Sequence, residues 1–418
     1  MTEQTENEIR SEVRAWLEAN WDSNLGLVEW RLKLADSGWG VPTWPTEWYG
    51  KGLSDGMGRM IDEEFERAGA VTVARTGIRN LAAATILAHG STMHKEKFLL
   101  RILTGEDSWC QLFSEPGSGS DLAGATTRAD MKGNKWVVNG QKVWTTSAHH
   151  AQYGLLLART DWDVAKHKGL SYFILDIEQD GVDVQPLRQM NGHASFNQVF
   201  FTDAVIEPEF LVSELGDGWK VATTTLMNER RGADGLNKYA KATDQPGRAY
   251  VEEAEEIAHQ LEPYKWYPQR AGRVDLVIQR ARETGKLNDP TVRQEIAKLL
   301  TLSKTTQWTA MRARAAQEQG GPPGPEGSLG KLSASNVARK AALVHTMLSG
   351  ADSMLTGDDS PLEGVIAEIL VSTPATSIAG GTDEIQKNII SERVLKLPKE
   401  TRFDTDRPFR EVPRNIVE

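Results

Sequence analysis

The spacing of apolar residues changes its period twice along this chain of 418 residues. Up to about residue 108 they recur every three to four positions, as at Val13, Trp16 and Leu17, which is the period of an α-helix. Short β-branched and aromatic runs follow, and then the helical period returns. The chain is therefore predicted to be an α+β multidomain protein: an N-terminal helical domain (1–108), a middle antiparallel β domain (109–212) and a C-terminal helical bundle (213–418).

Turn residues divide the middle segment into strands. Gly133 and Gly140, each next to an asparagine, stand among β-branched and aromatic residues and predict hairpin turns. Three further strands are predicted in YGLLLART, LSYFILDI and ASFNQVFFTDAVI.

The C-terminal segment has clear helix signals. Asp289 followed by Pro290 predicts a capped helix start, and Val292, Ile296, Leu299 and Leu300 form an apolar stripe after it. Residues 320–328, GGPPGPEGS, are predicted to be a loop between two helices.

Charge and cysteine content exclude several classes of protein. The 48 basic residues against 58 acidic ones give a net charge of -10, and no basic run is long enough to follow a nucleic-acid backbone. Cys110 is the only cysteine, so disulfides within the chain and cysteine metal clusters are excluded. The first residues are acidic and lack a signal-peptide pattern, and no run approaches about 18 apolar residues. We therefore expect a cytoplasmic protein that neither binds nucleic acid nor inserts into a membrane.

The stretch SEPGSGSD, residues 114–121, has two interpretations. Its composition alone favours a linker between a helical and a β domain. The alternative is a binding loop, because KVWTTSA follows about thirty residues later, with Trp144, Thr145 and Thr146 at a predicted strand end. An aromatic plane beside hydroxyl groups suits a flat heteroaromatic ligand, although Trp144 also suits packing in a β core.

Two further motifs are ambiguous by themselves. In MNERRG, Glu229 precedes Arg230 on a predicted helix, where charged residues are usually exposed to solvent. In GGTDEIQ, Gly380 and Gly381 precede a helix that begins near Asp383. A glycine turn at this place presents backbone N–H groups to an anion or a carbonyl oxygen, or simply caps the helix.

The order of these motifs resembles that of the acyl-CoA dehydrogenase family, from GWGVPTWPTEWYG (38–50) to the C-terminal ERVLKLP. The resemblance covers nearly the whole chain. It implies three domains of the predicted kinds, with FAD between the β domain and the C-terminal helices. It also implies α,β-dehydrogenation of an acyl-CoA thioester, in which a base takes the α proton and the flavin takes the β hydrogen as hydride.

The resemblance assigns site residues one by one. Gln111, Phe113 and Ser114 match positions that contact the isoalloxazine, where Trp144 packs and Thr146 donates toward flavin N5. Ser120 matches a contact to the substrate thioester arm. The adenosine end of FAD is assigned to Arg282, Thr284, Thr382 and Glu384.

The catalytic base is expected at an unusual position. Most family members carry it where this chain has Gly380, which has no side chain. A minority carries it immediately before an arginine of the C-terminal domain, which here is Glu229 before Arg230. The resemblance therefore implies Glu229 as base, Arg230 as a substrate contact and the Gly380 N–H as the group that polarises the thioester carbonyl.

The chain also departs from the family pattern. The family's arginine-threonine-phenylalanine-glycine segment is reduced to Arg282-Glu-Thr284-Gly285, and a later glycine-rich segment reads GADSMLTGDDSPLEG. Residues 239–272 have no clear family counterpart.

The resemblance leaves the detailed function open. The C-terminal half resembles a bacterial branch that acts on bulky acyl groups, including steroid side chains, as homotetramers or heterotetramers with a related subunit. An electron-transferring flavoprotein is the expected electron acceptor. The alternatives are an acyl-CoA oxidase or flavin monooxygenase of the same fold, and a structural subunit that completes a partner's FAD site.

Overall fold

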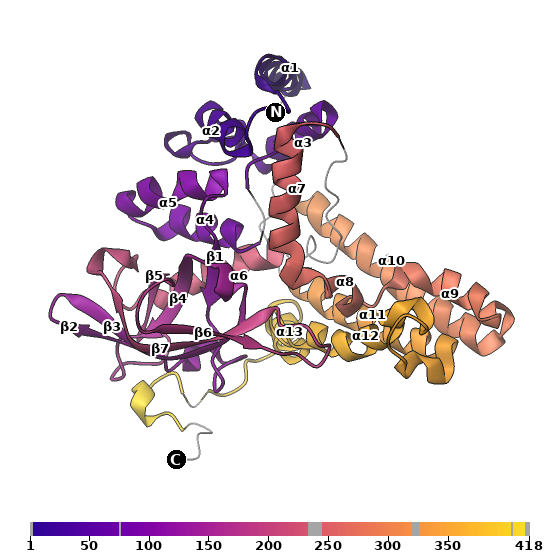
Figure 1. Cartoon of the computed structure of the whole chain (residues 1–418). Helices are drawn as coiled ribbons and strands as arrows, with labels where there is room; N and C mark the ends of the chain where they lie inside the picture. The colour runs from indigo at the N-terminus through magenta and orange to yellow at the C-terminus, as the bar shows by residue number, and fades with distance from the viewer. Residues whose placement is uncertain (1–2, 75–76, 233–244, 319–325, 403, 414–418) are drawn as a thin grey trace.

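The computed structural model describes residues 3–74, 77–232, 245–318, 326–402 and 404–413. The N-terminal helices lie above one β-sheet, and the C-terminal helices extend to one side of it (Figure 1). This arrangement confirms the predicted fold class. Within the described ranges, no helix combines the length and the apolar composition needed to cross a bilayer.

The N-terminal helices pack around aromatic side chains. They are α1 (Glu3–Asn20), α2 (Leu27–Ser37), α3 (Asp55–Ala68), α4 (Ile78–His89) and α5 (Thr92–Thr104). Trp30 of α2 is fully buried, and its indole N–H donates to the carbonyl of Val71 at 2.7 Å. Burial of this ring therefore leaves its polar atom satisfied. Ser54 and Ser91 accept hydrogen bonds from the first turns of α3 and α5, as N-cap residues do.

The sheet follows directly. In the described part of the chain it has eight strands: β1 (Trp109–Leu112), β2 (Arg128–Lys132), β3 (Lys135–Thr146), β4 (Tyr153–Arg159), β5 (Leu170–Asp176), β6 (Val182–Leu187), β7 (Phe196–Ile206) and β8 (Leu211–Val212). Their order is β6-β7-β3-β2-β4-β5-β8, and β1 pairs with β4. Pairing is antiparallel, except that β1 and β2 run parallel to β4.

Residues 154–158 of strand β4 are all apolar, because both faces of the strand are covered. Leu155 and Leu157 pack with the helices above the sheet, whereas Leu156 and Ala158 pack into the core formed by the other strands. Successive side chains of a strand point to opposite faces, so one apolar run serves two cores.

One of the two predicted hairpin turns is correct. Gly133 and Asn134 connect β2 and β3. The turn predicted at Asn139 and Gly140 is wrong, because both residues lie inside β3 where its register against β7 shifts. Gly140 has a φ of 148°, and a Cβ there would lie 2.8 Å from the Cα of Thr127. The glycine therefore marks a β-bulge with close backbone approach rather than a turn.

The C-terminal helices form the third part. They are α6 (Gly218–Gly232), α7 (Arg248–Leu261), α8 (Tyr267–Arg270), α9 (Val277–Glu283), α10 (Pro290–Glu318), α11 (Glu326–Ser349), α12 (Val365–Ser372) and α13 (Asp383–Arg393). The predicted cap at Asp289 is confirmed, since its Oδ1 accepts from the N–H groups of Thr291 and Val292. The predicted stripe is correct for three residues and wrong for Leu300, which is 38% exposed.

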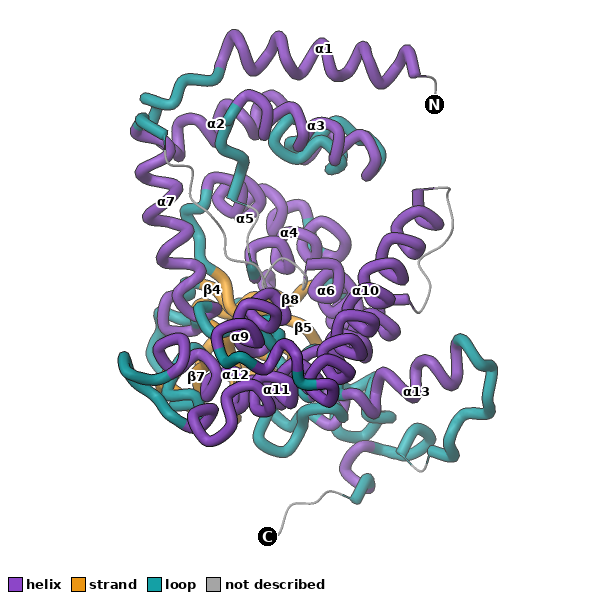
Figure 2. Tube along the Cα trace, turned by 90° about the vertical axis from the view of Figure 1, so that its right-hand side faces the viewer, coloured by secondary structure: helices purple, strands orange, loops and turns teal. Residues whose placement is uncertain are grey.

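Helix α7 belongs to the segment without a clear family counterpart, of which residues 239–244 lie outside the described ranges. It runs alongside the N-terminal helices and ends near the sheet (Figures 1 and 2). Glu256 accepts from Arg31 at 2.5 Å and from Arg79 at 2.7 Å. The two arginine side chains are only 3% and 8% exposed. One carboxylate of α7 thus forms ion pairs with two buried cations of the N-terminal helices.

Replacement of Glu256 by glutamine should lower the free energy of unfolding by about 3 kcal/mol, because two buried arginines lose their counter-charge. Hydrogen exchange of residues 248–261, measured by mass spectrometry, should become faster. Glu255→Gln is the matched control, since Glu255 is exposed on the same helix. Exchange that is equal in both variants would show that the ion pair does not hold α7.

Candidate functional site

Glu229 and Gln111 meet between α6 and the sheet. The amide Nε2 of Gln111, on β1, donates to Glu229 Oε2 at 3.4 Å. Helix α6 is held against the sheet and α4 by Thr225, whose hydroxyl is 3.0 Å from that of Tyr172 and 2.8 Å from that of Thr85. Glu229 follows Thr225 by four residues and so lies on the same face of the helix. Packing of α6 therefore brings the predicted base to a predicted flavin contact.

The loop SEPGSGSD is fixed by a buried ion pair. Lys142 of β3 is fully buried, and its Nζ donates to Glu115 Oε1 at 2.8 Å and to the carbonyl of Phe113 at 2.9 Å. Glu115 also accepts from the backbone N–H groups of Thr126 and Thr127. The second residue of this loop is therefore a structural anchor, which the small-residue composition of the stretch does not predict.

The ion pair sets the protonation state of Glu115. Burial by itself raises the pKa of Glu115, but the Lys142 ammonium and the two backbone N–H groups outweigh it and lower the pKa to about 2. The carboxylate is therefore charged at all physiological pH values. Because the pair is almost fully buried, removal of either residue would leave the other as an uncompensated buried charge.

The other predicted residues of this loop differ in exposure. The Phe113 side chain is 5% exposed and packs edge-on against Tyr172, so it faces the core. The carbonyl of Ser114 accepts from the Val143 N–H at 2.8 Å. Ser120 is exposed. The Phe113 side chain is therefore buried and its carbonyl is bound by Lys142, whereas the exposed Ser120 can present its hydroxyl.

Replacement of Glu115 by glutamine should destabilise the sheet by about 3–5 kcal/mol, because Lys142 would be left buried without a counter-charge. Chemical denaturation measures this effect. Glu207→Gln is the control, since its ion pair with Lys135 is 42% and 48% exposed and should contribute less than about 1 kcal/mol.

The same comparison should depend on pH. The folded-state pKa of Glu115 is about 2 and its unfolded value is about 4.3, so the stabilisation is fully present above pH 4.3 and is lost as pH falls toward 2. The difference in the free energy of unfolding between wild type and Glu115→Gln should become smaller as the pH falls from about 4.3 to about 2. A gap that does not change with pH would contradict the assignment of an ionised Glu115.

The end of β3 presents an exposed aromatic face. Trp144 is 57% exposed and has a φ of 61°, at a second shift of register between β3 and β7. Its ring meets Phe196 edge-on at 5.8 Å between centroids. The hydroxyl of Thr145 is buried and has no hydrogen-bond partner among the described atoms. A strained aromatic residue, solvent-facing and beside hydroxyl groups, fits a flat polar ring.

An aromatic cluster from the segment 239–272 bonds this face and lies near Glu229, and sequence reasoning missed it. The Thr146 hydroxyl hydrogen-bonds Tyr264, whose pKa is raised by burial and then by the charges of Tyr267 and Glu229. Tyr267 packs on Tyr264 at 4.8 Å and on Trp266 at 4.9 Å. The dense aromatic run YKWYP, residues 264–268, was the signal in the sequence.

The glycine turn before α13 is a helix cap. Gly380 and Gly381 have φ values of 67° and 88°, and the Thr382 hydroxyl accepts from the Ile385 N–H at 3.3 Å. Gln386 donates to the carbonyl of Gly381 at 3.1 Å. Gly380 and Glu384 are exposed. Gly380 lies in the turn before α13, whereas Glu229 lies on α6 and contacts Gln111 of β1.

The remaining predicted residues lie elsewhere. Arg282 is exposed on α9, and the Thr284 hydroxyl donates to the carbonyl of Arg280 at the end of that helix. Helix α9 lies at the far end of the C-terminal helices from the sheet (Figure 1). The structure therefore does not bring these two residues to Trp144. The side chain of Arg230 lies outside the described residues.

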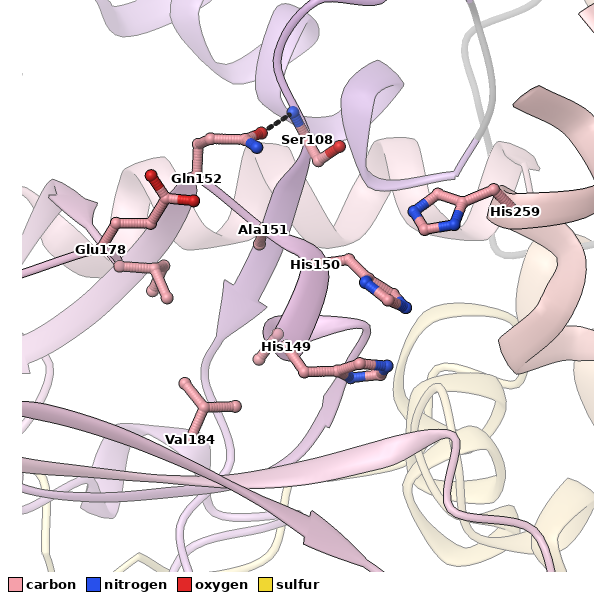
Figure 3. Close-up of a pocket in the computed structure, with 10 residues that line it drawn as sticks. Ser108, His149, His150, Ala151, Gln152, Glu178, Val184 and His259 are labelled. Atoms are coloured by element: carbon pink, nitrogen blue, oxygen red, sulfur yellow. Dashed lines mark hydrogen bonds between the residues drawn. The ribbon is translucent and has the colours of Figure 1, made fainter. Parts of the chain in front are cut away.

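A separate groove of about 530 Å³ lies where α7 meets the sheet. Three histidines line it, with His149 and His150 at 3.9 Å and His150 and His259 at 4.3 Å between ring centroids (Figure 3). Burial, followed by the neighbouring His149 and His259, lowers the pKa of His150. No group of acidic, histidine or cysteine side chains in the described ranges has the arrangement of a metal site. None of the predicted site residues lines this groove.

Three family models match the chain in sequence order. They are "Acyl-CoA dehydrogenase, N-terminal domain" over residues 2–106, "Acyl-CoA dehydrogenase, middle domain" over residues 110–204 and "Acyl-CoA dehydrogenase, C-terminal domain" over residues 271–395.

Individual proteins are similar over the same extent. Acyl-CoA dehydrogenase IpdE1 of Mycobacterium tuberculosis is 33% identical over 94% of this chain and 98% of its own length. Among solved structures, the Tcur3481-Tcur3483 steroid ACAD is 24% identical with a TM-score of 0.67, covering 96% of this chain and 99% of that chain. The ChsE4-ChsE5 complex from Mycobacterium tuberculosis is 26% identical with a TM-score of 0.65, again over 96% and 99%.

Proposed function

The chain belongs to the acyl-CoA dehydrogenase family of oxidoreductases, and we propose that it converts an acyl-CoA thioester into the trans-2-enoyl-CoA with FAD as cofactor. The observation that carries the proposal is the hydrogen bond from Gln111 to Glu229. Tyr264, which hydrogen-bonds Thr146, lies close enough for the charge of Glu229 to raise its pKa. Together these residues support a role for one carboxylate beside a flat polar ring.

The residues at the strand end fit a flavin ring. The exposed face of Trp144 offers a stacking plane, and the hydroxyl of Thr145 is buried without a described partner. The amide of Gln111 and the hydroxyl of Thr146 are hydrogen-bonding groups of the kind that a flavin edge requires. Ser114 and Phe113 are the further residues proposed to contact the ring. FAD, when bound, accepts the hydride that leaves the β carbon of the substrate.

Glu229 is the proposed general base. Its carboxylate takes the α proton, and the electron pair of that C–H bond forms the new double bond as the β hydrogen leaves with its own pair. The Gly380 N–H polarises the thioester carbonyl, which makes the α proton more acidic. Ser120 and Arg230 contact the substrate. The absence of a side chain at Gly380 leaves Glu229 as the carboxylate for this role.

The adenosine end of FAD is proposed to involve two parts of the chain. Thr382 and Glu384 precede and begin α13, whereas Arg282 and Thr284 lie on and after α9, far from Trp144. Because Arg282 and Thr284 lie so far from the ring site of their own subunit, we propose that they contact the adenosine end of an FAD bound to a second subunit. We therefore propose a tetramer of identical or related subunits, in keeping with the paired names of the solved relatives.

A bulky acyl-CoA is the proposed substrate, since one solved neighbour is named a steroid ACAD. The electrons then pass to an electron-transferring flavoprotein. The visible spectrum of the chain purified alone tests whether it holds FAD by itself.

Replacement of Glu229 by glutamine should leave the flavin content unchanged and slow flavin reduction at least 100-fold, because glutamine cannot accept the α proton. Anaerobic mixing with acyl-CoA, followed by loss of the flavin absorbance, measures the rate.

Glu214→Gln is the matched control, because Glu214 is exposed just before the same helix. Reduction at the wild-type rate in the Glu229 variant would remove this residue from the mechanism.

A further inference from the structure

The chain continues beyond α13 and returns to the sheet. The C-terminal family model ends at residue 395, so the described residues 396–402 and 404–413 lie outside it. This tail passes below the sheet, where it forms a short helical turn, Phe409–Glu411 (Figure 1). A tail that docks so far from its own domain has a specific partner surface.

Phe409 anchors the tail. Its side chain is 1% exposed, and the guanidinium of Arg159 lies 3.4 Å from the centre of its ring. The Phe409 N–H donates to the carbonyl of Val164 at 2.9 Å, and the Arg410 N–H donates to that of Trp162 at 3.1 Å. Backbone and side chain together therefore fix the tail to the connection between β4 and β5.

The same arginine holds the short helical turn Leu122–Gly124 that follows SEPGSGSD. Arg159 is fully buried and donates to the carbonyl of Ala123 at 2.6 Å and to that of Ala125 at 2.9 Å. A buried guanidinium needs all of these acceptors. Its face is covered by Phe409, so loss of that ring would open the site to water and weaken the hold on both carbonyls.

A second link is ionic. Lys166 is 6% exposed, and its Nζ donates to Asp121 Oδ1 at 2.8 Å and to Asp404 of the tail. Asp121 is the last residue of SEPGSGSD, and its carbonyl accepts from the Ser118 hydroxyl at 2.5 Å. The tail, one ammonium group and the loop thus form a single chain of contacts.

We propose that residues 404–410 form a strap that orders residues 118–125, with Arg159 and Lys166 as positioning residues for acyl-CoA binding. The second half of this statement rests on the proposed function, in which Ser120 contacts the substrate. Ser120 lies between two held residues and is itself exposed. A loop rich in glycine loses much conformational entropy when it is ordered by a ligand, so ordering it in advance strengthens binding.

The test uses the full-length protein with FAD. Asp404→Asn and Phe409→Ala should raise KM for acyl-CoA about tenfold, with kcat and flavin content within about twofold of wild type. Hydrogen exchange of residues 116–125 should become faster in both variants, and Asp404→Glu should restore both readouts. Arg407→Ala is the control, because Arg407 is exposed in the same tail.

The outcomes separate the two proposals. Unchanged exchange in residues 116–125 of a folded Asp404→Asn protein would overturn the strap, whatever the activity. Faster exchange with unchanged KM would overturn the role of the strap in substrate binding. A wild-type protein that does not bind acyl-CoA would overturn the proposed function, while exchange would still decide whether the strap orders the loop. If Phe409→Ala fails to fold, Asp404→Asn carries the test.

Discussion

The buried ion pair of Glu115 and Lys142 is the interaction on which the rest of the site depends. It joins a loop of small residues to the longest strand of the sheet, at a point two residues before Trp144. The pair offsets part of the conformational entropy that a loop of small residues and glycines loses on ordering. The pair also directs the carbonyl of Phe113 toward Lys142. The same two charges therefore order both edges of the proposed flavin surface.

The loop is held at three places by groups far apart in the sequence. Glu115 fixes its start, the turn between Glu115 and Ser118 closes it, and Lys166 fixes its end, while Arg159 holds the turn that follows. Between these points, a Cβ added at Gly117 or Gly119 would have open space around it. The structure thus combines rigid ends with an open centre, which suits a segment that has to receive a ligand.

Local signals in the sequence predicted the helices, most strands and the cap at Asp289, because period, proline and turn residues act over a few positions. They failed at Asn139 and Gly140, which lie inside β3 at a β-bulge. The glycine there allows the close approach of Thr127 and does not form a turn. The positions of Trp144, Thr146 and Glu229 came from motifs and a family resemblance. Tyr264 and the anchoring role of Glu115 required the tertiary structure, since their partners lie 118 and 27 residues away in sequence.

The late position of helix α7 in the sequence affects how the N-terminal helices fold during synthesis. Arg31 and Arg79 are buried among the first hundred residues, yet their shared carboxylate comes from Glu256, 225 and 177 positions later. During synthesis the N-terminal helices therefore emerge before the carboxylate that pairs with both cations exists. They can collapse early, as N-terminal domains generally do, but cannot reach their final electrostatic state until the ribosome has passed residue 256. The last step of assembling the first domain thus belongs to the second half of translation.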